Sequence, residues 1–141
     1  SPRDGDLLLL GPGKPSVIGE VPVGRLVEDG TVLISATDET IAQRRRLAFA
    51  GVVSIAVALD GRGDLSGDPD VVMSGVPPRG RDGQALDAVV DDAIFSTLDG
   101  LSRSKRRDAD TVANAVERAV RSALANSWGK KPQVHVLVLE V

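Results

Sequence analysis

Apolar residues recur every three or four positions in two stretches of the second half of the chain, residues 86–101 and residues 112–128. Each set forms one apolar stripe, which a helix buries against a sheet or a neighbouring helix. Asp108 can cap the start of the second stretch, and Gly129 has the position of a residue that ends a helix. The pattern therefore predicts two amphipathic helices joined by a short connection.

Three further stretches have the apolar patterns of β-strands. Val52–Leu59 is almost wholly apolar, which is typical of a strand buried on both faces. Residues 65–73 predict a second strand, broken by a Gly and a Pro, with a bulge or an edge position. Residues 133–141 place apolar side chains on both faces, which predicts a central strand. The order predicts an α+β domain over residues 52–141, a β-β-α-α-β arrangement with a three-stranded sheet and two helices on one face.

Short apolar runs and turns characterise residues 1–36. Leu7–Leu10, Ser16–Glu20 and Val32–Ser35 predict strands, and the Asp-Gly step within Glu28–Gly30 suits a hairpin turn. These strands are too few and too short to bury a core alone. We expect residues 1–36 to belong to the edge of a larger sheet.

Residues 37–51 predict a helix that links this segment to the α+β domain. Thr37 or Asp38 can cap its start, and Gly51 suits the position just after its end. Its apolar side is formed by Ile41, Ala48 and Phe49, while three consecutive arginines face elsewhere.

Composition excludes several functional classes. The 141-residue chain is 42% apolar but only 2% aromatic, and its net charge is −3. It therefore lacks both the aromatic platforms of a base-stacking domain and the overall basic charge of a dedicated nucleic-acid-binding domain. It has no cysteine, its N-terminus does not resemble a signal peptide, and no apolar run approaches the length of a membrane span. We expect a cytoplasmic protein without a membrane partner.

The sequence offers no complete set of catalytic or metal-binding residues. The single histidine, His135, lies in a strand that the pattern predicts to be buried, and one histidine cannot supply the ligands of a zinc hydrolase. The acidic run from Asp60 to Asp70 fails the spacing of a calcium loop. The segment Gly11–Ser16 fails that of a phosphate loop. We expect no catalytic residue, metal or cofactor in this chain, although acid–base catalysis by carboxylates alone stays open.

Basic residues form three groups that could contact RNA phosphates. The groups lie in the linker helix, in the connection between the two predicted helices, and after the second of them. Such contacts would be salt-dependent and without sequence preference, and the alternative is a solvated surface. The candidate residues are Arg44, Arg45, Arg46, Arg103, Lys105, Arg106, Arg107, Lys130 and Lys131.

Several segments along the chain are informative through their order and spacing: Arg44–Gly51 (RRRLAFAG), Val52–Asp60 (VVSIAVALD), Gly67-Asp68-Pro69, Gly75-Val76-Pro77, Val112–Trp128 and Trp128–Pro132 (WGKKP). Together they resemble the C-terminal region of bacterial ribonuclease J, and most closely its proteobacterial branch. Upstream, Gly19-Glu20 and residues 28–31 resemble the last strands of the family's metallo-β-lactamase domain, so the resemblance covers nearly the whole chain. The loop at Val76-Pro77-Pro78 departs from other branches, in which aromatic residues are common.

The resemblance implies a role in a metal-dependent endoribonuclease and 5′→3′ exoribonuclease of RNA processing and decay. The family's zinc ligands lie in histidine-rich motifs upstream of the region matched here, so no catalytic residue carries over. The implied domains are residues 1–36 as terminal strands of the metallo-β-lactamase domain, 37–51 as a linker helix and 52–141 as the C-terminal domain.

Two hypotheses about function follow. The first is a non-catalytic assembly domain that supports activity through self-association as a homodimer or larger oligomer, because two helices can cover only one face of the predicted sheet. The alternative is an accessory RNA-binding module that uses the local basic groups.

Overall fold

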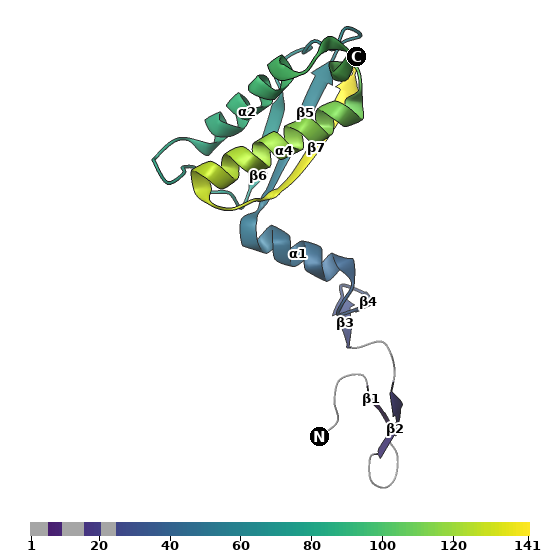
Figure 1. Ribbon diagram of the computed structural model, residues 1–141. Helices are drawn as coiled ribbons and strands as arrows, with labels where there is room; N and C mark the ends of the chain where they lie inside the picture. Colours follow the sequence, from purple (N-terminus) through teal and green to yellow (C-terminus); the bar gives the residue numbers. More distant parts are fainter. Residues whose placement is uncertain (1–5, 10–15, 21–24) are drawn as a thin grey trace. The chain divides into compact units, whose positions relative to one another are not determined.

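The computed structural model describes residues 6–9, 16–20 and 25–141. The chain divides into two compact units, Ser1–Arg45 and Arg46–Val141 (Figure 1).

The first unit contains two antiparallel strand pairs. β1 (Asp6–Leu9) pairs with β2 (Ser16–Glu20), and β3 (Leu26–Asp29) pairs with β4 (Val32–Ser35). Asp29 lies opposite Val32, and Gly30 in the turn between them has a φ of +60°. The hairpin predicted from the Asp-Gly step is therefore confirmed. Leu10 and the rejected phosphate-loop motif up to Pro15 lie outside the described residues.

Helix α1 (Glu39–Ala50) occupies the predicted linker and has the predicted ends. Of the two candidate caps, Asp38 is the one that acts, because its Oδ1 accepts a hydrogen bond of 2.9 Å from the Thr40 N–H. Gly51 follows the helix with a φ of +77°, and its N–H donates to the Leu47 carbonyl at 2.7 Å. This left-handed conformation suits glycine and turns the chain directly into the sheet.

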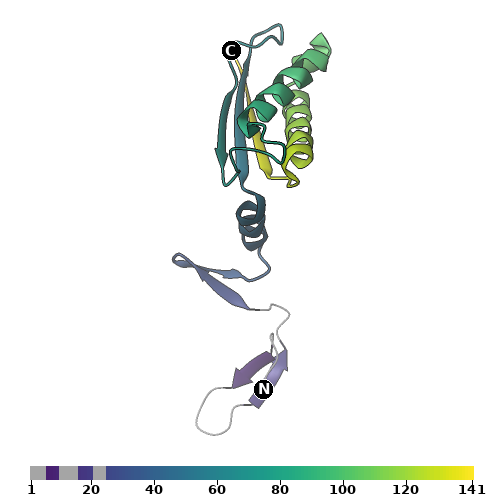
Figure 2. The ribbon, with the colours of Figure 1, turned by 90° about the vertical axis from the view of Figure 1, so that its left-hand side faces the viewer.

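The second unit is a three-stranded sheet with helices on one face, as the sequence pattern predicts. β5 (Val52–Leu59) lies in the centre, antiparallel to β6 (Asp70–Ser74) and parallel to β7 (Gln133–Glu140). Helices α2 (Leu86–Gly100), α3 (Arg103–Arg106) and α4 (Ala109–Trp128) connect β6 to β7. Figure 2 shows α2 and α4 packed on the same side of the sheet.

The core forms where alternate side chains of β5 meet the apolar stripes of the two long helices. In β5 every second residue from Val53 to Leu59 is buried, because successive side chains of a strand point to opposite faces. Each long helix buries one residue in every four, which matches the predicted stripes. The buried helical residues are Leu86, Val90, Ile94 and Leu98 of α2 and Val112, Val116, Val120 and Leu124 of α4.

Local signals explain the ends of α4 and the presence of α3. Asp108 caps α4 by accepting a hydrogen bond from the Asp110 N–H, and Gly129 ends the helix with a φ of +92°. Both ends agree with prediction. The single turn α3 was not predicted, because four residues carry no periodic apolar pattern. It begins at Ser102, whose hydroxyl accepts from the Lys105 N–H.

One prediction about the strands is wrong, and another is right in position but wrong in its bounds. β7 lies at an edge of the sheet, not in its centre, and pairs with β5. The second strand lies at the other edge, one of its two predicted positions, but covers Asp70–Ser74; Leu65 forms an isolated bridge to Leu59. Gly67 has a φ of +99°, and Pro69 has no N–H to donate, so the segment before Asp70 cannot continue the ladder.

Candidate functional site

One face of the sheet in the second unit is apolar but not covered by the helices (Figure 2). Ser54 and Ala56 of β5 point to this face, because the alternate residues of that strand point into the core. Large apolar side chains lie on both sides of them: Val72 of β6 is 62% exposed, and Leu137 and Leu139 of β7 are 60% and 47% exposed. We call this surface the open face.

The open face is hollowed over its central strand. Small side chains on β5 lie between larger ones on β6 and β7, and the register places Ala56 beside Leu137 and Ser54 beside His135. The hollow has a volume of about 430 Å³ and is lined by Ser54, Ile55, Ala56, Asp70, Val72, His135, Val136 and Leu137. A ridge of aliphatic side chains from another surface would fit it.

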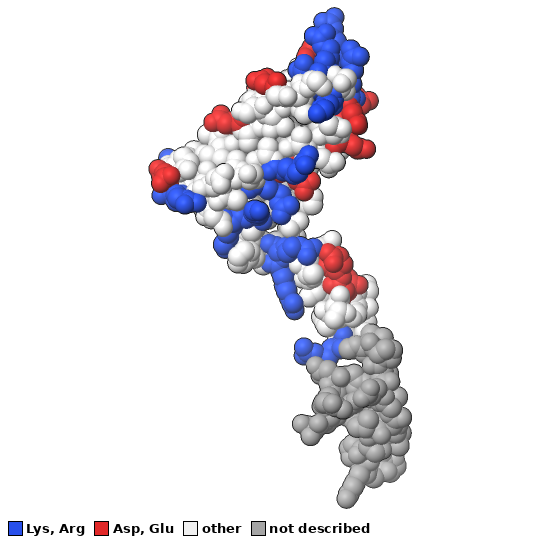
Figure 3. Space-filling view, viewed as in Figure 1, with Lys and Arg blue, Asp and Glu red and all other residues white. Residues whose placement is uncertain are grey.

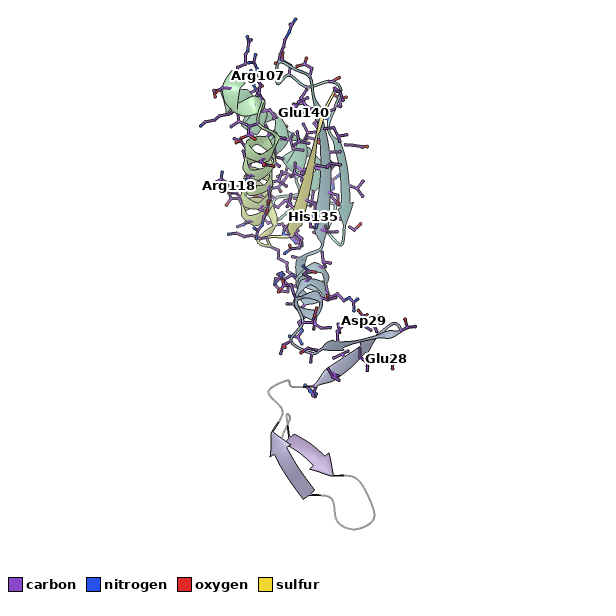
Figure 4. All side chains as sticks on the ribbon, turned by 90° about the vertical axis from the view of Figure 1, so that its right-hand side faces the viewer. Glu28, Asp29, Arg107, Arg118, His135 and Glu140 are labelled. Atoms are coloured by element: carbon purple, nitrogen blue, oxygen red, sulfur yellow. The ribbon has the colours of Figure 1, made fainter. Side chains whose placement is uncertain are left out.

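His135 is exposed on this open face, in contrast to the buried position that the sequence pattern predicts (Figure 4). The correction follows from β7 lying at the edge of a sheet whose second face has no helix. Within the described ranges, no three His, Cys, Asp or Glu residues gather in a way that could hold a metal ion.

The acidic run after β5 forms a turn. Oδ1 of Asp60 accepts hydrogen bonds from the N–H groups of Arg62, at 2.8 Å, and Asp64, at 3.1 Å. These backbone donors, that of Asp64 foremost, hold the pKa of the Asp60 carboxyl below its usual value because they favour the charged form. The carboxylate thus stabilises the turn itself.

The first predicted basic group, in α1, is partly occupied by an ion pair. Arg44 donates to both carboxylate oxygens of Asp29 at 2.8 Å, a bidentate geometry. The hydrogen bond from Arg44 is the largest cause of the lowered pKa of Asp29. Arg45 and Arg46 are exposed.

The second predicted basic group surrounds α3. Arg103, Lys105 and Arg107 are exposed, whereas Arg106 is half-buried and its Nη1 lies 3.5 Å from Oδ1 of Asp64. Figure 4 shows Arg107 at the same end of the unit as Glu140, the last residue of β7. Arg106 therefore joins this connection to the turn after β5.

Lys130 and Lys131, the third predicted group, have different surroundings. Nζ of Lys130 donates to the Phe49 carbonyl at 2.8 Å and lies 4.1 Å from the centre of the Phe49 ring. Lys131 instead lines a surface hollow of about 310 Å³ with Arg118, Arg121, Ser122, Ala125 and Asn126. Sequence reasoning missed the two arginines. Their spacing of three residues on the polar side of α4 was a signal that could have found them.

The described part of the chain contains no helix that is long and apolar enough to cross a membrane.

Comparison with known proteins gives a consistent result. A family model described as the ribonuclease J C-terminal domain matches residues 39–141. A protein named ribonuclease J from Sinorhizobium meliloti is 43% identical over 139 residues, which cover 99% of this chain and 25% of that protein. Proteins of the same name from Corynebacterium glutamicum and Mycobacterium tuberculosis are 25% and 27% identical, and the chain covers 17% and 22% of their lengths. The chain thus spans at most a quarter of the length of these relatives.

Proposed function

Because this chain belongs to the ribonuclease J C-terminal domain family, we propose that it is an assembly domain that joins the subunits of a ribonuclease J-like enzyme. The open face carries this proposal. Val72 and Leu137 are each more than half exposed, whereas the opposite face of the sheet packs against the core. Exposed apolar patches of this kind mark protein–protein contacts.

The shape of the open face favours a second copy of this chain as the occupant. In a two-fold contact the same patch must be complementary to itself. The open face offers both halves of such a fit, since the Leu137–Leu139 ridge of one copy can enter the hollow over Ser54 and Ala56 of the other. Asp70 and His135 at the hollow supply polar groups among the apolar ones, as at the rim of known interfaces.

In such an enzyme, catalysis would take place in parts outside this chain. A ribonuclease J-like enzyme would hydrolyse RNA, as an endonuclease and a 5′→3′ exonuclease, with zinc held by histidine-rich motifs elsewhere. The single histidine of this chain and its small share of the relatives' length support that division. We place residues 1–36 at the end of a metallo-β-lactamase domain and residues 37–51 in a linker; the family match, which starts at residue 39, supports this boundary.

Contacts within the fold involve three of the nine cations predicted to contact RNA, which weakens the RNA-binding alternative at those three positions. Arg44 pairs with Asp29, Arg106 approaches Asp64, and Lys130 binds the Phe49 carbonyl. These contacts give several of the cations a role within the fold.

Sedimentation velocity of the full chain over a range of micromolar concentrations tests the assembly proposal. The wild type is expected to associate, and Leu137→Glu to sediment as a monomer, because a two-fold contact places two carboxylates in one apolar interface. Such a juxtaposition costs several kcal/mol, or roughly a 100-fold loss of affinity or more.

Phe95→Glu is the matched control. Phe95 is 41% exposed on α2, on the other side of the sheet from the open face, so this variant is expected to associate like the wild type. Circular dichroism checks that both variants fold. A wild type that is monomeric at every concentration, or association lost in Phe95→Glu and kept in Leu137→Glu, refutes the proposal.

A further inference from the structure

The hollow on α4 gathers three cations without a carboxylate among its lining residues. Arg118, Arg121 and Lys131 line it together with Ser122, Ala125 and Asn126. Arg118 lies on the side of α4 that faces away from the sheet (Figure 4). Figure 3, which views the unit from its helices, shows Lys and Arg side chains gathered beside α4. We call this surface the α4 hollow.

Among the described residues, no acidic partner neutralises the cations of the α4 hollow, one of which, Lys131, belongs to the third predicted basic group. Within the described residues, neither arginine nor Lys131 has a carboxylate oxygen within 4.0 Å. The side chain of Arg118 makes one hydrogen bond, at 3.4 Å, to the Asn114 carbonyl of its own helix. Nε of Arg121 is buried without a partner. These donors are unsaturated, and an oxyanion is the ligand that would satisfy them.

The charge balance at this end of α4 favours an anion. The C-terminal end of a helix carries about half a negative charge, which repels anions. Three full positive charges around the α4 hollow exceed it. The net local charge is therefore positive, although the charge of the whole chain is −3.

We propose that the α4 hollow binds the sugar–phosphate backbone of RNA. The hollow lies on an outer helix surface, so it suits an extended polyanion better than a small enclosed ligand. It has no aromatic residue on which a base could stack, and arginine, lysine, serine and asparagine are residues that contact phosphate and sugar. Binding here would be independent of base sequence.

This inference adds a second activity to the proposed assembly role. The α4 hollow lies on α4, which covers one face of the sheet, and the open face is the opposite one (Figure 2). Self-association through the open face would leave the α4 hollow accessible. An assembled enzyme would then present one RNA-contacting hollow on each subunit.

Fluorescence anisotropy with the full chain and a labelled single-stranded RNA of mixed sequence tests the proposal. The double variant Arg118→Gln/Arg121→Gln is expected to bind at least about 10-fold more weakly at low salt. It should also lower the slope of log K against log salt by about 1.4, because each lost phosphate contact on a single strand contributes about 0.7. A second RNA of different sequence should bind equally well.

The matched control is Arg62→Gln/Arg79→Gln, which removes the same charge from exposed positions that do not line the α4 hollow. It should bind RNA within about 2-fold of the wild type, because neither side chain lines the α4 hollow. Equal losses in the two double variants refute the proposal. A larger loss of RNA affinity in Arg103→Gln/Lys105→Gln than in Arg118→Gln/Arg121→Gln also refutes it, because the RNA contact would then lie at α3.

Two further results would overturn the inference. One is no detectable RNA binding by the wild type at low salt. The other is binding of polyglutamate as tight as that of RNA, which would show that the surface has no preference for phosphate. Thermal unfolding checks that the variants fold. Leu137→Glu separates the two proposals, because it should abolish association and leave RNA binding by the monomer intact.

Discussion

Replacing Gly51 by alanine tests how α1 joins the sheet, since this glycine combines a left-handed backbone with close neighbours. Its φ is +77°, and a methyl group added there would lie 2.5 Å from the Ser74 carbonyl oxygen and 2.6 Å from that of Gly75. Gly83 has nearly the same φ, +78°, with nothing within 4 Å of the corresponding position. The two glycines share a backbone conformation and differ in crowding.

The expected losses of stability follow from the left-handed backbone and from the crowding. A left-handed backbone costs a residue with a Cβ about 1–2 kcal/mol, so Gly83→Ala should lower the free energy of unfolding by about that amount. The same cost applies at Gly51, and crowding against backbone atoms adds about 1–3 kcal/mol. Gly51→Ala should therefore lose about 2–5 kcal/mol, a large part of the 5–15 kcal/mol or so that is typical of a whole domain.

Urea unfolding of the full chain, followed by circular dichroism, measures both losses. The comparison needs unchanged m values, because a changed m value indicates an altered compactness of one of the states. Thermal unfolding gives a second reading, with each kcal/mol expected to lower Tm by about 4–8 °C in a domain of this size. Equal losses in the two variants would show that crowding at Gly51 has no effect, and the reasoning would be wrong.

Three other substitutions test the core, a helix cap and a turn. Leu124→Ala should lower the free energy of unfolding by about 2–5 kcal/mol because the side chain is fully buried; a loss below 1 kcal/mol or so in urea unfolding would contradict this packing. Asp108→Ala should cost about 0.5–2 kcal/mol, since its carboxylate caps α4, whereas Asp108→Asn should keep most of that stability. The lowered pKa of Asp60 means that its charged form stabilises the turn above the ordinary pKa of 3.8, and that this contribution is lost as the pH falls through the lower folded pKa. Stability measured from pH 6 to pH 2 should therefore fall less steeply in Asp60→Asn than in the wild type, and parallel curves would refute this role.

Sequence pattern was sufficient for the two long helices of the second unit. The residues buried from α2 and α4 recur at every fourth position, and such a stripe identifies a helix together with the face it buries. Asp108 and Gly129 marked both ends of α4 because capping is a local interaction. The short helix α3 lacks both a stripe and a hydrophobic residue with long-range contacts, so local reasoning could not find it.

The candidate sites were harder to predict because they depend on contacts between distant segments. Arg44 and Arg118 are alike in sequence, as arginines on polar helix faces. Only the fold shows that Asp29 neutralises the first and that Lys131 lies beside the second. The sequence therefore pointed to cations in runs, whereas the cations of the α4 hollow come from α4 and from the segment after it.

β7 shows why an apolar strand cannot be placed from its pattern alone. Apolar side chains on both faces of a strand predict a central position only if the same chain covers both faces. In the structure, Leu137 and Leu139 are instead exposed on an edge strand. Edge strands are normally protected by charged side chains or proline. From Val134 to Leu139, β7 has neither a proline nor an Asp, Glu, Lys or Arg residue. An unprotected edge beside an apolar open face is a surface on which another chain can pair, and this supports the proposed self-association.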